Sequence, residues 1–99
     1  MNVEWYQEIL KICDRLFLNI LKLLKKDDIF VVCADYGNDP LIGHSRHTRE
    51  YVPLLVYKKD AQAVQLGVRE TLADIGATVC DYFQVKPCEY GKSFLSKIV

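Results

Sequence analysis

The fold prediction starts from Ile29-Phe30-Val31-Val32-Cys33-Ala34, an uninterrupted apolar run that is rich in β-branched residues. Such a run, without alternating polar side chains, is typical of a strand buried on both faces of a parallel sheet. The polar pair Asp27-Asp28 precedes it and makes a turn, and an amphipathic segment lies before that turn. A helix, a short turn and a buried strand are half of a βαβ unit, so the sequence predicts an α/β fold.

Residues 3–26, on the N-terminal side of this run, are predicted to form a helix. Apolar side chains recur there mostly at intervals of three and four, the helical period: Trp5, Ile9, Ile12, Leu16, Ile20, Leu23 and Leu24. Cys13, Phe17 and Leu21 widen the apolar surface, so we expect the helix to be covered on more than one side.

On the C-terminal side, a second strand is predicted from Val52 to Tyr57. The segment from Ala61 to Gly67 is compatible with a short strand or with coil, because its periodicity does not decide. A second helix is predicted from Thr71 to Phe83, with Thr71 as its cap. A turn follows at residues 89–93, and Phe94-Leu95 opens a short apolar tail.

Composition excludes several classes of protein. The chain has 99 residues, 13 basic and 13 acidic side chains and 51% hydrophobic residues, so it is neither disordered nor a basic nucleic-acid binder. No apolar run is long enough to span a membrane, and the N-terminus lacks a signal-peptide pattern. The four cysteines show no CxxC spacing, which favours reduced thiols in a cytoplasmic protein. Zero net charge and high apolar content predict self-association.

The stretch from Asp35 to Glu50 holds the candidate chemistry. Asp35 directly follows the buried strand, and ligands of open α/β sheets bind at the carboxyl ends of the strands. His47 precedes the second strand and is positioned to return to the same crevice, and His44 is a third candidate ligand. A carboxylate with imidazoles suits a divalent metal ion. Arg46 and Arg49 either suit bidentate contact with a phosphate or are only surface charge.

Plainer interpretations of the same residues remain open. An aspartate followed by Gly37, Asn38 and Pro40 is often only turn chemistry. Histidines in a polar loop are more often solvated than metal-bound. A Ser/His/Asp hydrolase has little support, because no GxSxG motif is present.

Two segments strengthen the metal interpretation by resemblance. Residues 34–40, Ala-Asp-Tyr-Gly-Asn-Asp-Pro, and residues 47–55, His-Thr-Arg-Glu-Tyr-Val-Pro-Leu-Leu, closely resemble the C-terminal part of phosphopentomutases, metalloenzymes of the alkaline phosphatase superfamily. Residues 66–78 and 90–95 are similar to later segments of that family, in the same order. The resemblance implies one partial domain over residues 1–99, an alkaline-phosphatase-like core with a short, mostly parallel sheet flanked by helices.

The resemblance also implies a function. Phosphopentomutases move phosphate between the 1- and 5-positions of ribose or deoxyribose with two divalent metals, usually manganese, and a phosphorylated threonine. Carried over, Asp35 and His47 are metal ligands, Arg49 orders the loop or contacts substrate, and Tyr36 replaces a family histidine. His44, in the same loop, is the candidate to supply the imidazole ligand that Tyr36 lacks. The nucleophile and the other ligands have no counterpart here, so we expect a C-terminal fragment with no catalytic residue of its own.

Two other hypotheses compete with this one. In the first, the chain is a non-catalytic binding or interaction module that kept the fold, and Tyr36 is its main support. A dedicated zinc module built from Cys80, Cys88 and the two histidines rests only on residue types and ranks last.

Overall fold

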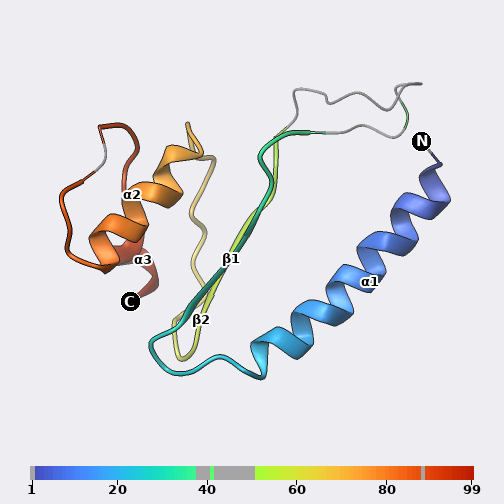
Figure 1. Ribbon diagram of the computed structural model, residues 1–99, viewed down its shortest axis with the longest axis horizontal. Coiled ribbons are helices and arrows are strands. Elements are labelled where there is room, and N and C mark those ends of the chain that lie inside the picture. The colour runs from blue at the N-terminus through green and yellow to red at the C-terminus, as the bar shows by residue number, and fades with distance from the viewer. Residues whose placement is uncertain (1, 38–40, 42–50, 88) are drawn as a thin grey trace. The chain divides into compact units, whose positions relative to one another are not determined.

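The computed structural model describes residues 2–37, 41, 51–87 and 89–99. Within these described ranges, five elements follow one another, three helices and two strands (Figure 1). They fall into two compact units, Met1–Lys59 and Asp60–Val99. Helices and strands together confirm the α/β class predicted from the sequence.

The first unit begins with helix α1, Val3–Leu21. The side chain of Asn2 caps it by accepting a hydrogen bond from the Trp5 backbone N–H at 3.0 Å. The predicted helix is confirmed, but it ends at Leu21 rather than at residue 26. The cause is a local turn, in which Asp28 accepts the Lys25 backbone N–H at 2.8 Å and donates its own N–H to the Lys25 carbonyl at 3.1 Å.

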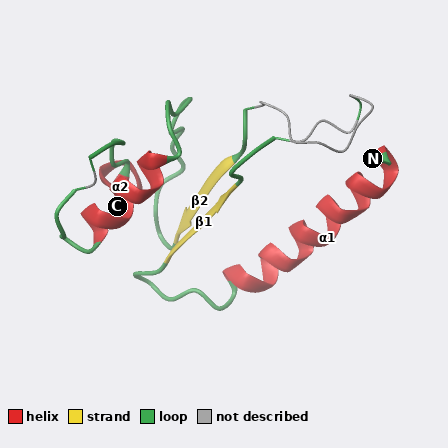
Figure 2. Cartoon of the chain, turned by 45° about the horizontal axis from the view of Figure 1, so that its top comes forward, coloured by secondary structure: helices red, strands yellow, loops and turns green. Residues whose placement is uncertain are grey.

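The two strands form one antiparallel pair. β1, Ile29–Cys33, lies beside β2, Leu54–Lys58, and Ile29 is opposite Lys58 in the register (Figure 2). The predicted mostly parallel sheet is therefore wrong for the strands that the structure describes. An unalternating apolar run gives no strand direction by itself, and β1 is only half-buried, with Cys33 exposed. Alternating burial along β2 fits a pair with one covered face.

Helix α1 contacts β1 through an aromatic pair. The rings of Phe17 and Phe30 meet edge to face with centroids 5.9 Å apart. The half-buried side chains of α1 share that side of the helix: Val3, Tyr6, Cys13, Phe17 and Leu21. No residue of α1 is fully buried, so the expected cover on several sides is not found among the described residues.

The second unit contains α2, Ala73–Tyr82, and α3, Leu95–Ile98. α2 confirms the second predicted helix, but it begins at Ala73 and its N-cap is Leu72, which makes no side-chain capping bond. The predicted cap Thr71 lies one residue earlier, where its hydroxyl accepts the Ala73 backbone N–H at 3.1 Å. The segment from Ala61 to Gly67 is coil. α3 lies where only an apolar tail was predicted. Among the described residues, the buried apolar side chains gather here: Ala77, Phe94 and Ile98.

Candidate metal centre

Asp35 lies where the sequence analysis placed it, just beyond the carboxyl end of β1. The backbone bends at Asp35 and Tyr36, and the following Gly37 is buried. Asp35 itself is exposed, so its carboxylate oxygens are accessible from solvent. An accessible carboxylate at a strand end supplies the hard oxygen donors that divalent metals take. The donor chemistry of Asp35 therefore fits a metal ligand.

Tyr36 follows it with a half-exposed phenol, 49% accessible. A neutral phenol is a weaker donor to divalent manganese or zinc than an imidazole. Tyr36 therefore offers only a weak donor for a divalent metal ion.

The other predicted site residues, His44, His47 and Arg49, lie outside the described residues. Within the ranges that the structure describes, no three or more His, Cys, Asp or Glu side chains come together. The structure accordingly locates Asp35 and Tyr36 beside each other and leaves the remaining ligands as predictions.

A buried ion pair, which sequence reasoning missed, organises the second unit. Arg69 Nε donates to Asp74 Oδ2 at 2.7 Å, and only 19% and 7% of the two side chains are exposed. Arg69 Nη2 also donates to the Lys92 carbonyl at 3.2 Å, and the guanidinium lies 5.5 Å from the centre of the Phe94 ring. An Arg five residues before an Asp does not by itself predict a buried pair, because the burial depends on the distant Lys92 and Phe94.

Asp74 ties the returning chain to the first turn of α2. Its Oδ1 accepts the Lys92 backbone N–H at 2.9 Å. One helical turn later, Thr78 donates its hydroxyl proton to the Asp74 carbonyl at 2.8 Å and accepts the Phe94 N–H at 3.1 Å. These bonds satisfy polar groups that are buried beside the Phe94 ring. The network holds the core of this unit and supplies no open ligand site.

The Lys92 backbone N–H, with help from Arg69, lowers the pKa of the Asp74 carboxyl below its ordinary value near 3.8, although burial opposes the shift. Ionised Asp74 therefore stabilises the fold above about pH 4, and this stabilisation is lost as the pH falls through the lowered pKa. We expect the thermal unfolding midpoint, followed by circular dichroism, to drop as the pH falls below about 4. The drop should be smaller in Asp74→Asn, and an equal drop in both proteins would contradict the assignment.

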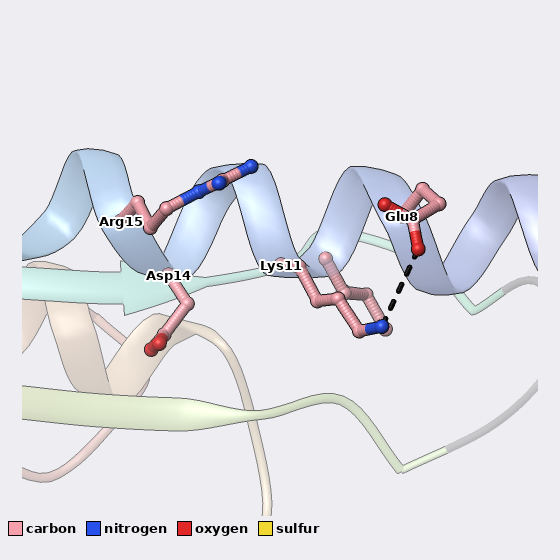
Figure 3. A pocket seen from close by; sticks show the side chains of 5 residues that line it. Glu8, Lys11, Asp14 and Arg15 are labelled. Atoms are coloured by element: carbon pink, nitrogen blue, oxygen red, sulfur yellow. Dashed lines mark hydrogen bonds and ion pairs between the residues drawn. The ribbon is translucent and has the colours of Figure 1, made fainter.

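A shallow hollow lies on α1 in the first unit, lined by Glu8, Leu10, Lys11, Asp14 and Arg15 (Figure 3). Its side chains all come from one helix and include two acids and two bases. Lys11 Nζ and Glu8 Oε1 are 3.3 Å apart, but both side chains are mostly exposed. An exposed pair of this kind contributes little stability, and the hollow presents no convergent donors for a ligand.

Among the described residues, none of the helices is both long and apolar enough to cross a membrane.

Comparison with known proteins shows what this chain is similar to. The phosphopentomutase of Photorhabdus laumondii is 47% identical over 94 residues, which are 95% of this chain and 23% of that enzyme. Those of Proteus mirabilis and Vibrio cholerae are 47% identical over 92 residues and 43% identical over 94 residues. The chain spans less than a quarter of the length of these relatives.

A profile of the family described as Metalloenzyme superfamily matches residues 1–87. This match covers β1, Asp35 and the predicted ligands before β2. Membership of such a family implies a divalent metal in its intact members. With most of its residues matched, the chain belongs to the metalloenzyme superfamily.

Proposed function

We propose that this chain is the C-terminal segment of a phosphopentomutase-like enzyme core, a single partial domain to which Asp35 and His47 contribute metal ligands. The observation that carries the proposal is the 47% identity to a phosphopentomutase over 95% of the chain, together with the accessible carboxylate of Asp35 at the end of β1. The substrate class is a phosphorylated pentose, and the cofactor is divalent manganese.

The chemistry assigned to each residue follows from its type. Asp35 and His47 would hold the metal, which supplies charge neutralisation for phosphoryl transfer when bound. Arg49 orders the loop or contacts the phosphate through its planar guanidinium. Tyr36 and His44 are the two candidates for the position that an imidazole fills in the family. We place the protein in the cytoplasm, with no nucleic-acid or membrane partner, and we propose that its copies associate through exposed apolar faces.

Isolated from the rest of such a core, the chain is expected to be inactive. Two-metal phosphoryl transfer requires both ions, a nucleophile and a clamp on the transferred group, and this chain has only a minority of those groups. The measurement is a mutase and phosphatase assay of the purified chain with added manganese. Robust turnover that follows the 99-residue chain through purification would contradict the expectation.

The positive test is a chimera. In it, the segment of the Photorhabdus laumondii phosphopentomutase that matches this chain is replaced by the sequence of this chain. We expect manganese-dependent mutase activity from this chimera, reduced by Tyr36 but well above background. A folded chimera without activity, whose parent enzyme is active in parallel, would refute the proposal.

A non-catalytic binding module is the second candidate, and the half-exposed phenol of Tyr36 is the observation that favours it. Calorimetric titration of the isolated chain with manganese and zinc separates the two candidates. Tight stoichiometric binding that is lost in Asp35→Ala and in His47→Ala would count against the module. If neither the isolated chain nor the chimera binds manganese or zinc, the result favours the binding module.

A further inference from the structure

A second apolar row runs along α1, on a different side from the row that contacts Phe30. It comprises five side chains that are 38–63% exposed and that we name the outer stripe: Trp5, Ile9, Ile12, Leu16 and Ile20. Successive members are three or four residues apart, so the row runs nearly straight along the helix axis. An exposed apolar row of this length marks an interaction surface rather than a solvated helix face.

The charges beside the outer stripe are ordered along one edge of the helix. Glu4 and Glu8 flank its N-terminal half, and Arg15 and Lys22 flank its C-terminal half. These four positions lie within about 40° of one another around the axis at 100° per residue. Glu8 also reaches Lys11, but 63% of the Glu8 side chain is exposed and remains open to another cation (Figure 3).

We propose that the outer stripe is the surface on which two copies of this chain pair, with their α1 helices antiparallel. Antiparallel pairing sets Trp5 beside Ile20 of the second copy and Ile9 beside its Leu16. In the same register, Glu4 meets Lys22 and Glu8 meets Arg15 of the second copy. Parallel pairing would instead place the charged edges of the two copies on opposite sides of the interface, so that these ion pairs would not form.

The stripe is self-complementary, as a two-fold interface requires. Trp5 of the first copy contacts Ile20 of the second, and Ile20 of the first copy contacts Trp5 of the second. Zero net charge leaves no overall repulsion to oppose the pairing. This inference rests on the self-association proposed above and is independent of the metal site. Loss of dimerisation and loss of mutase activity are therefore measured in separate experiments.

The first test compares two leucines of α1 that are equally exposed. Leu16, 54% exposed, lies in the outer stripe, whereas Leu18, 56% exposed, lies nearly opposite, about 200° around the helix. In sedimentation equilibrium of the full chain, Leu16→Gln should weaken dimerisation about a hundredfold, because both copies lose an apolar contact. Leu18→Gln should change it less than threefold, and equal weakening by both would overturn the proposal.

The second test reverses the charges and does not depend on apolar packing. One variant, Glu4→Lys with Glu8→Lys, makes the edge wholly basic, and another, Arg15→Glu with Lys22→Glu, makes it wholly acidic. Each alone should dimerise at least about tenfold more weakly than the unchanged chain, and their mixture should form a heterodimer. Circular dichroism of each variant confirms that α1 persists.

Three results would overturn the inference. They are a monomer at high concentration, charge-reversed variants that self-associate as strongly as the unchanged chain, and growth into aggregates of no fixed size. The last result is expected if the outer stripe packs instead against the remainder of a longer metalloenzyme chain.

Discussion

Replacing Asp35 by Asn in the chimeric enzyme is expected to lower mutase activity by at least about a thousandfold, or about 4 kcal/mol of transition-state stabilisation. The amide keeps the shape of the side chain but removes the negative charge and one strong oxygen donor. Divalent manganese is held by charge as much as by geometry, so loss of the carboxylate empties or misplaces the ion. The measurement is kcat/KM at saturating manganese.

Asp14→Asn is the matched control for this substitution. Asp14 is also an exposed aspartate of the first unit, but it lies on α1, away from the strand end. We expect its substitution to leave activity within about twofold. The reverse change at the neighbouring position, Tyr36→His, should raise manganese affinity, because imidazole is a better ligand than a neutral phenol. Equal activity of Asp35→Asn and Asp14→Asn would contradict a ligand role for Asp35.

Gly91→Ala is expected to unfold the second unit, at a cost of about 3–5 kcal/mol. Gly91 has φ +93°, and an added Cβ would overlap the backbone carbonyl of Ala73 and lie 2.9 Å from the Asp74 nitrogen. The backbone of α2 cannot move aside without loss of the bond from Lys92 to Asp74. The hydrogen bonds that Arg69 and Asp74 make to Lys92 would therefore be strained or lost.

Gly67→Ala separates the destabilisation caused by the steric clash from that caused by the positive φ alone. Gly67 also has a positive φ, +74°, but a Cβ there meets nothing within 4 Å. Its substitution should cost only about 1 kcal/mol, the conformational penalty of an L-residue in that region. Urea unfolding followed by circular dichroism measures both variants. A Gly91→Ala protein as stable as Gly67→Ala would show that the close approach to α2 is not required.

The sequence predicted the local elements better than their arrangement. Helical periodicity located α1 and α2, and the β-branched run located β1, because these signals reside in neighbouring residues. The antiparallel direction of β2 and the helix α3 were missed, since both depend on contacts between distant segments. The Arg69–Asp74 pair was missed for the same reason, because its value comes from burial and from Lys92.

In the candidate site too, local features could be predicted from the sequence, whereas contacts between distant residues could not. Asp35 could be placed from its position after an apolar strand, a purely local feature that the structure confirms. The pairing of Asp35 with His47 rests on resemblance to phosphopentomutases, because spacing along a loop does not fix which side chains meet.

The number of manganese ions that the chimera binds is the decisive measurement for the ligand roles of Asp35 and His47. Titration followed by electron paramagnetic resonance counts bound Mn²⁺ per chain in the chimera and in its Asp35→Asn and His47→Ala variants. If these residues are ligands, each variant loses at least one tightly bound Mn²⁺ that the unsubstituted chimera retains. Unchanged stoichiometry and affinity in both variants would contradict the metal-ligand roles of Asp35 and His47.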